Sequence, residues 1–218
     1  MQALIDKTLE QLKSDPKVWG VLLTGSYARG DATPGSDLDF WVLLRDVLER
    51  RFRAEQVDGA WLEIHYRNLS QARIRLTQEP IELYNHLDGR ILHDPDSHLA
   101  QLRAQAAQMF ENYRTPEAES RAIAYWLSGV RRKLEAAFAA GDTVKIGYLS
   151  STSAWKILEG LWAANNKPMP PSGSVGAHLG RLELPLTPAQ LSHDLFAASP
   201  EVRGRTALHL MDWTLERL

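Results

Sequence analysis

The sequence predicts an α+β protein, in which a small mixed sheet with surrounding helices is followed by an all-α helical bundle. In the first half, short runs rich in Val, Leu, Phe and Trp alternate with polar turns, as is typical of strands. In the second half, apolar residues recur every three or four positions, as is typical of amphipathic helices. We therefore expect two domains, residues 1–113 and 114–218, each with its own core.

The first domain opens with a predicted helix and two predicted strands. Residues 4–12 have the apolar spacing of a helix, and Pro16 lies beyond its end. Apolar runs at 18–24 and 38–44 are short and contain Val, Leu, Phe and Trp, which favours two adjacent strands. Between the two runs, small residues predict a loop at the edge of the sheet.

The next segment predicts a third strand with two different faces. Residues 47–54 are charged and predict a connection or a short helix, and residues 57–66 alternate as a strand does. Leu62 and Ile64 fall on the apolar face together with Tyr66. The opposite face receives Trp61, Glu63 and His65. Four more elements complete this domain: a helix at 70–77, a strand or turn at 81–86, a strand at 90–93 and a helix at 99–113.

Capping residues and loop-forming residues divide the second half into helices. Thr115 is predicted to cap a helix that has Pro116 in its first turn and stops at Gly141. A second helix is predicted at 144–164, followed by a loop at 165–176 that contains three prolines. Two cap-and-proline pairs predict the starts of the last two helices: Thr187-Pro188 and Ser199-Pro200.

The stretch from residue 20 to residue 44 carries the chemistry. The strand period of two places Asp37 and Asp39 on one face, with α-carbons roughly 7 Å apart. Two neighbouring carboxylates repel each other, so the pair predicts a cation between them.

These residues resemble a known family. Gly25-Ser26, ten intervening residues and Asp37-Leu38-Asp39 at the start of an apolar strand are similar to the signature of the DNA polymerase β-type nucleotidyltransferase superfamily. The likeness is greatest to small bacterial members with GSYARG, here residues 25–30, and SDLD, here residues 36–39. Such sites have a third carboxylate on a neighbouring strand, and Glu63 matches it. The resemblance implies an enzyme that uses a nucleoside triphosphate.

The resemblance also implies roles for individual residues. The catalytic and metal-binding residues would be Asp37, Asp39 and Glu63, which would hold two Mg²⁺ ions, with Mn²⁺ as an alternative. Nucleotide-binding residues would be Gly25, Ser26, Arg29 and Ser36. The glycine would let backbone amides approach the phosphates, and the serine hydroxyl would donate to one of them. The arginine would supply positive charge or brace the loop.

The acceptor of the nucleotide stays open. The resemblance admits a hydroxyl of a small molecule of the aminoglycoside type or of a protein side chain. The net charge is −2, which argues against a long nucleic acid as the acceptor. The helical half resembles the domains that follow such modules in aminoglycoside nucleotidyltransferases and HEPN proteins, so we expect it to wall the cleft or to form a homodimer.

A different class of function is a fused antitoxin and toxin, in which the helical half is inert or carries a HEPN-like ribonuclease site. Arg203 and His209 have the sequence separation of the arginine and histidine in HEPN ribonucleases. On an ideal helix, however, six positions place these two residues about 120° apart around the axis. A protein that binds a triphosphate without converting it is a third alternative. Zero cysteines, no signal-peptide core and no membrane span lead us to expect a cytoplasmic location.

Overall fold

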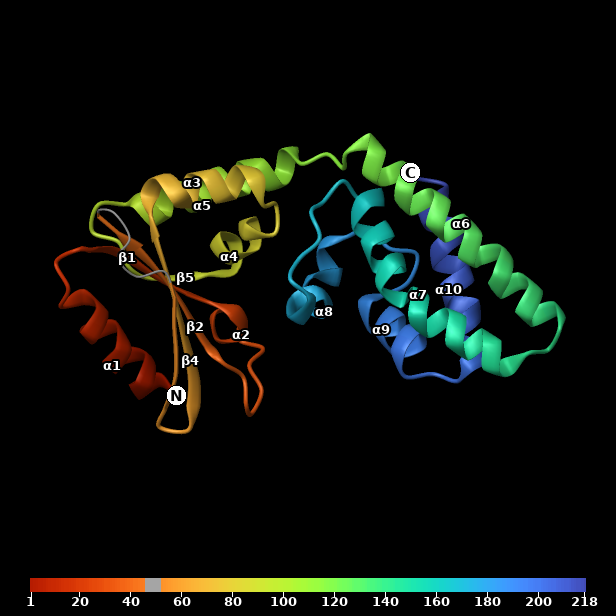
Figure 1. Ribbon diagram of the computed structural model, residues 1–218, viewed down its shortest axis with the longest axis horizontal. Coiled ribbons are helices and arrows are strands. Elements are labelled where there is room, and N and C mark those ends of the chain that lie inside the picture. Colours follow the sequence, from red (N-terminus) through yellow and green to blue (C-terminus); the bar gives the residue numbers. More distant parts are fainter. Residues whose placement is uncertain (46–51) are drawn as a thin grey trace. The chain divides into compact units, whose positions relative to one another are not determined.

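The structure is a computed structural model that describes residues 1–45 and 52–218 (Figure 1). It divides into two compact units, Met1–Asn112 and Tyr113–Leu218. Among the described residues, strands occur in the first unit and the second contains only helices and their connections, which confirms the predicted fold class. No helix in the described part of the chain has the length and apolar character needed to cross a membrane.

The first unit is a mixed sheet with helices on both faces (Figure 1). The strand order is β3-β4-β2-β1-β5, in which β2 and β4 are parallel and the other neighbours are antiparallel. Its elements are α1 (Gln2–Lys13), β1 (Val18–Thr24), α2 (Gly25–Arg29), β2 (Leu38–Leu44), β3 (Phe52–Val57), β4 (Ala60–Asn68), α3 (Leu69–Gln78), α4 (Glu82–Asp88), β5 (Arg90–His93) and α5 (His98–Asn112).

The two faces of the sheet bury different clusters. Leu38, Phe40 and Val42 alternate along β2 and pack with residues of β1, β4 and α1 on one face. Leu22 of β1 and Leu43 of β2 point to the other face, where they pack with α3, α4 and α5. Because side chains alternate along a strand, the odd-numbered positions of β2 and β4 share that second face.

Most elements predicted for the first domain are confirmed. The strands at 18–24, 38–44 and 90–93 have the predicted bounds. The helices predicted at 4–12, 70–77 and 99–113 are α1, α3 and α5, with ends shifted by one or two residues. The predicted division of the third strand into an apolar and a polar face is also confirmed, since Leu62, Ile64 and Tyr66 are buried.

The prediction of a single strand at 57–66 is wrong, because a hairpin occupies this region. Asp58 and Gly59 join β3 to β4 with φ angles of 51° and 83°. A two-residue turn with both φ angles positive is typical of a hairpin, and Asp-Gly is a favoured sequence for it. Of the connection or short helix expected at 47–54, residues 47–51 lie outside the described residues. Its last three residues belong to β3.

Two further expectations for the first domain are corrected. The strand or turn expected at 81–86 is the helix α4. Leu83 and Tyr84 are both buried, which alternation along a strand would not permit on one face, and a helix places them side by side against α5 and the sheet. The loop expected after the first strand begins with the short helix α2, which ends at Gly30 with a φ of 87°.

The second unit is a helical bundle, in agreement with the predicted fold class. Its apolar core is formed mainly by the two longest helices and the last one, α6, α7 and α10, with α9 packed against them. The elements are α6 (Glu117–Ala139), α7 (Thr143–Ala164), η1 (Ser172–Ser174), α8 (Val175–His178), η2 (Leu179–Arg181), α9 (Pro188–Phe196) and α10 (Pro200–Leu215).

Two of the three predicted caps are confirmed. Thr187 and Ser199 accept hydrogen bonds from backbone N–H groups three residues later, and a proline follows each of them. The cap at Thr115 is wrong: its hydroxyl donates to the carbonyl of Ala163 at 3.1 Å, and Pro116 itself precedes α6. The loop expected at 165–176 contains η1 and the start of α8.

The turn at Gly59 generates a stability prediction. Gly59→Ala should lower the free energy of unfolding by about 1 to 2 kcal/mol, because φ is 83° there and a Cβ is strained in that region even though no atom lies within 4 Å. Gly176→Ala is the control, since that exposed glycine has an ordinary φ and open space around it. Urea denaturation measures both variants. Equal stability of the two would contradict the strained turn.

Candidate metal and nucleotide site

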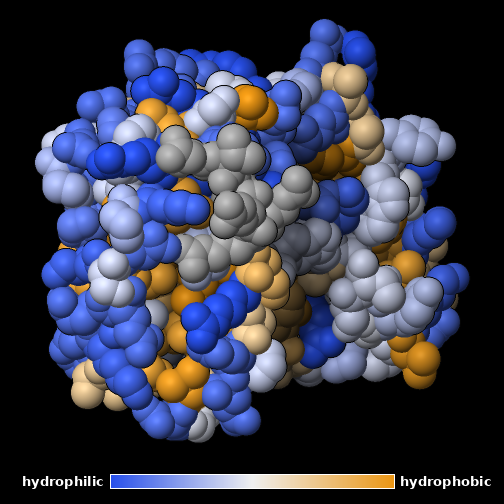
Figure 2. Space-filling view, turned by 60° about the vertical axis from the view of Figure 1, so that its left-hand side comes forward, coloured by the Kyte–Doolittle hydropathy of each residue, from blue (hydrophilic) through white to orange (hydrophobic). Residues whose placement is uncertain are grey.

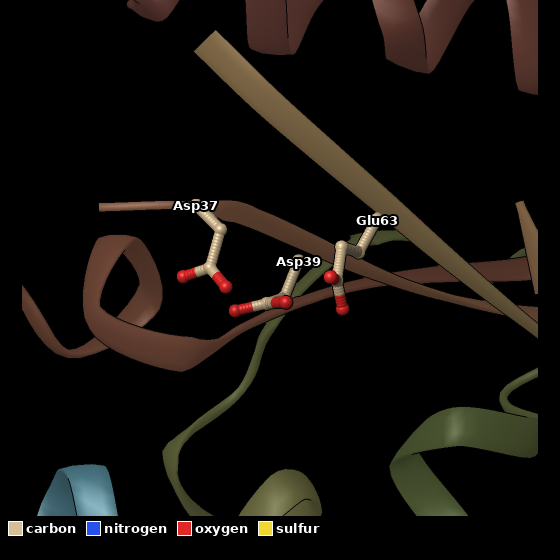
Figure 3. Close-up of side chains that lie close together, drawn as sticks. All are labelled: Asp37, Asp39 and Glu63. Atoms are coloured by element: carbon tan, nitrogen blue, oxygen red, sulfur yellow. The ribbon is translucent and has the colours of Figure 1, made fainter. Parts of the chain in front are cut away.

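Pairing between β2 and β4 brings three carboxylates together (Figure 3). Asp37 precedes β2, and Asp39 is the second residue of that strand. Asp39 pairs with Glu63 in the parallel register between the two strands, so both side chains point to the same face. The three residues each offer a carboxylate oxygen, and these oxygens lie within 4.8 Å of one another. The structure thus brings together the three predicted metal ligands.

The surroundings of Asp39 disfavour its ionised form. Burial, followed by the negative charges of Asp37 and Glu63, raises the pKa of its carboxyl from 3.8 to about 6. Arg29 acts in the opposite sense but more weakly. A positive charge beside such a carboxyl group would favour its ionised form.

The chemistry of this donor set fits a hard divalent cation. Three carboxylates offer only oxygen, the ligand type that Mg²⁺ and Mn²⁺ prefer, and they converge from two directions while Asp37 remains exposed. A cation bound here would relieve the repulsion that raises the pKa of Asp39. The fit rests on the geometry of the side chains and on the charge that they leave uncompensated.

Gly25 is fixed by its closeness to Asp39. A Cβ at this position would lie 2.2 Å from Oδ2 of Asp39, and the φ of Gly25 is 67°. The chain therefore turns sharply from β1 into α2 while its backbone runs directly beside the carboxylate. Only glycine satisfies both conditions. The backbone at the start of α2 therefore lies next to any ligand that the carboxylates bind.

The other predicted nucleotide-binding residues lie in the segment between β1 and β2. Arg29 pairs with Asp31, with 3.2 Å between Nη2 and Oδ1. This ion pair braces the segment, which is one of the two roles predicted for Arg29. Ser36 accepts a hydrogen bond from the backbone N–H of Thr33 at 2.9 Å. Ser26 lies in α2 directly after Gly25, and its carbonyl accepts from Gly30 at 2.8 Å. Their part in nucleotide binding stays a prediction.

The sequence reasoning missed the contacts of Glu63. The indole N–H of Trp61 donates to Oε1 of Glu63 at 3.2 Å, and Nε2 of His65 lies 3.8 Å from Oε2. Burial and the nearby Arg67 lower the pKa of His65, although Glu63 opposes this shift. The alternate spacing of positions 61, 63 and 65 on one strand was the signal that these three side chains are neighbours.

Arg203 and His209, the residues of the alternative ribonuclease site, lie on α10 in the second unit. The guanidinium of Arg203 donates to the hydroxyl of Ser151 at 2.7 Å and to the carbonyls of Phe196 and Ala198. These contacts connect α10 to α7 and to the end of α9, so a structural role accounts for the arginine. His209 is exposed.

One family model matches the part of the chain that carries the three carboxylates. Residues 5–90 match the family model described as the nucleotidyltransferase domain, and all three carboxylates lie within that segment. A solved structure, that of a nucleotidyltransferase-like protein from Exiguobacterium sibiricum 255-15, is similar to this chain at 17% identity and a TM-score of 0.43. That match covers 99% of this chain and 74% of the other. No curated protein matches the sequence.

The raised pKa of Asp39 predicts a pH dependence of the metal-free protein. Because the pKa is about 6 in the folded state and 3.8 in the unfolded reference, the stability linked to this proton is present below pH 3.8 and is lost as the pH rises through 6. Between pH 4 and pH 7 the wild type should lose about 1 to 2 kcal/mol relative to Asp39→Asn, allowing for solvent screening. Parallel pH profiles of unfolding free energy in the two proteins would contradict this.

Gly25 generates a second prediction about the site. We expect Mg²⁺ to raise the thermal unfolding temperature of the wild type, and Gly25→Ala should abolish this rise, because the new Cβ would displace the Asp39 carboxylate. Gly30→Ala is the matched control: its φ of 87° imposes similar backbone strain, but no atom lies within 4 Å of the added Cβ. Differential scanning calorimetry with and without Mg²⁺ measures both. Loss of the response in both variants would assign the effect to strain alone.

Proposed function

We propose that the protein, whose residues 5–90 match the family model of the nucleotidyltransferase domain, transfers a nucleoside monophosphate from a nucleoside triphosphate to a hydroxyl group with the help of Mg²⁺. The observation that carries the proposal is the convergence of Asp37, Asp39 and Glu63 beside the tight turn at Gly25. The function and the metal are supported by the same side chains, because transfer from a triphosphate develops negative charge that oxygen-bound cations stabilise.

Each residue has a distinct part in this proposal. Asp37, Asp39 and Glu63 would hold the metal, and a metal bound there would neutralise negative charge on the phosphate oxygens. Glu63 also accepts the proton of the attacking hydroxyl, since one of its oxygens is already oriented by Trp61. The backbone after Gly25 approaches the phosphates, and the Ser26 hydroxyl donates to one of them.

Arg29, a cation in the segment between β1 and β2, has a supporting role. Arg29 is paired with Asp31 and its side chain is only 16% exposed, so it holds the segment between β1 and β2 in place. Its charge also favours the ionised form of Asp39. The same charge would attract a triphosphate that approaches this segment. We expect bracing and attraction to act together.

For the acceptor we propose a hydroxyl of a small molecule or of a protein side chain. A long nucleic acid is a poorer fit, because the chain carries 25 basic and 27 acidic residues and thus has no excess of cations for a phosphate backbone. On the face drawn in Figure 2, hydrophilic residues predominate and hydrophobic ones form separate patches.

Homodimerisation through the helical unit is a further part of the proposal. Tyr125 on α6 and Val144 on α7 are each 84% exposed, and Tyr148 is 65% exposed. Trp126 and Trp155 also reach the surface of these two helices. Large exposed side chains of this kind are enriched at protein interfaces, and a second copy of this helical face would cover them.

The carboxylates provide the test of the proposed reaction. Asp37→Asn combined with Asp39→Asn should lower nucleotide transfer from a labelled triphosphate by at least roughly 1,000-fold, because the ligands of the metal are lost. Release of pyrophosphate and transfer of label are measured against a panel of hydroxyl compounds and a cell extract. Asp6→Asn with Glu10→Gln removes two charges from the exposed face of α1 and should leave the rate unchanged. Transfer at the parental rate in the aspartate variant would exclude this site.

A further inference from the structure

The edge strand β3 places three side chains beside the carboxylates. In the antiparallel register Phe52 pairs with His65, and Ala54 pairs with Glu63. Gln56 pairs with Trp61 in the same way. Directly opposite residues of antiparallel strands point to the same face, and the rings of Phe52 and His65 confirm it with centroids 4.8 Å apart. The face that carries the carboxylates therefore extends across β4 to the edge of the sheet.

The small side chain of Ala54 leaves an open path, here called the lane, along the sheet surface from this edge to Glu63. Phe52 and Gln56 flank it on the same face, with α-carbons about 14 Å apart by strand geometry. The short alanine side chain lies between them and opposite the carboxylate. We refer to Phe52, Ala54, Gln56, Trp61 and His65 as the edge slot. Its inner end is Glu63 and its outer end is the edge of the sheet, because β3 is the last strand.

The walls of the edge slot are aromatic and face solvent. Phe52 is 52% exposed and Trp61 is 47% exposed, although both carry large apolar surfaces. Phe52 is fixed against the ring of His65. The indole of Trp61 is oriented by its hydrogen bond to Glu63 at 3.2 Å. Two oriented aromatic faces left in water, on both sides of a small residue, form a seat for a flat ring.

The charge of the edge slot indicates which ring it takes. None of the five described residues of the edge slot is a lysine or arginine. Arg53 is the neighbouring residue of β3 but points to the opposite face, where it pairs with Glu55 at 2.6 Å. Arg67 shares the face of Glu63, but it lies beyond His65 with its guanidinium over the ring of Trp41, 5.2 Å from the centroid. A triphosphate or another anion is therefore a poor fit. A sugar ring needs several hydrogen-bonding partners, whereas the walls offer mainly carbon. The amide of Gln56 and the carboxylate of Glu63 suffice for a single hydroxyl.

We propose that the edge slot binds the acceptor, and that the acceptor is a small neutral aromatic compound with a ring hydroxyl, a phenol. This inference rests on the proposed function. The ring lies over Ala54 between Phe52 and Trp61, and its hydroxyl points to Glu63. The phenolic oxygen forms a bond to the α-phosphorus, and the bond from that phosphorus to the pyrophosphate oxygen breaks, with its electron pair leaving on pyrophosphate. The hydroxyl proton passes to the Glu63 carboxylate.

The acidity of a phenol agrees with this assignment. A phenolic hydroxyl has a pKa near 10, far below that of an aliphatic alcohol. A carboxylate therefore removes the proton of a phenol more easily than that of an alcohol. Oε1 of Glu63 accepts from Trp61 at 3.2 Å and Oε2 lies 3.8 Å from Nε2 of His65, so the carboxylate that receives the proton is held between two members of the edge slot. An acceptor that supplies an acidic hydroxyl and a stacking ring uses every group that the edge slot provides.

Filling the lane tests the inference. Ala54→Trp should weaken binding of the probe 4-methylphenol by at least about tenfold, as expected for loss of a stacked ring. Arg53→Trp adds the same bulk one residue away on the opposite face and should bind the probe like the wild type. Saturation-transfer NMR measures phenol binding in the presence of Mg²⁺ and a non-hydrolysable triphosphate, and calorimetry measures binding of that triphosphate. Triphosphate affinity should be the same in all three proteins.

A second pair of variants keeps the test independent of the folding of Ala54→Trp. Trp61→Ala removes one wall and should weaken 4-methylphenol binding, whereas Trp61→Phe keeps a ring and should retain it. Lack of phenol binding by the wild type, unchanged binding in both Ala54→Trp and Trp61→Ala, or stronger binding of methyl glucoside each overturns the edge slot. Lack of Mg²⁺-dependent triphosphate binding by the wild type would instead overturn the proposed function.

Discussion

Three negative charges held on neighbouring strands are the constraint on which the rest of the first unit depends. The pairing of β2 with β4 fixes Asp39 opposite Glu63, and Asp37 joins them from the segment before β2. Burial and repulsion together raise the pKa of Asp39, so the fold accepts an electrostatic cost at this point. That cost is expected at a functional site and would have no purpose in a purely structural sheet edge.

The division of the sheet into two faces explains how the fold tolerates the electrostatic cost of the three carboxylates. One face is filled by apolar residues of β1, β2 and β4 against α1, and it supplies the stability of the unit. The other is apolar only where α3, α4 and α5 cover it. Toward β3 the same face carries carboxylates and exposed aromatic rings. The candidate site thus occupies the part of the second face that α3, α4 and α5 leave uncovered.

The sequence was informative where patterns are local. The strands around Asp37 and Asp39 and the face of Glu63 could be predicted, because alternation and the Gly-Ser spacing are visible in a few residues. The Asp58-Gly59 hairpin was missed although its dipeptide is a recognised turn signal, since the alternation appeared to run through it. The predictions of a cap at Thr115 and of a strand or turn at 81–86 were wrong because packing with distant residues decides both. The hydroxyl of Thr115 donates to the carbonyl of Ala163, and α5 covers Leu83.

The strand order has a consequence for how the site forms. β1 and β2 are consecutive antiparallel strands, and β3 and β4 form a tight hairpin, so each pair closes over a short length of chain. The parallel seam between β2 and β4 joins the two ribbons and must close a longer loop of chain. Asp37 and Asp39 belong to one ribbon and Glu63 to the other. The three ligands therefore become neighbours only when β2 pairs with β4, and local opening of this pairing would separate Glu63 from the two aspartates.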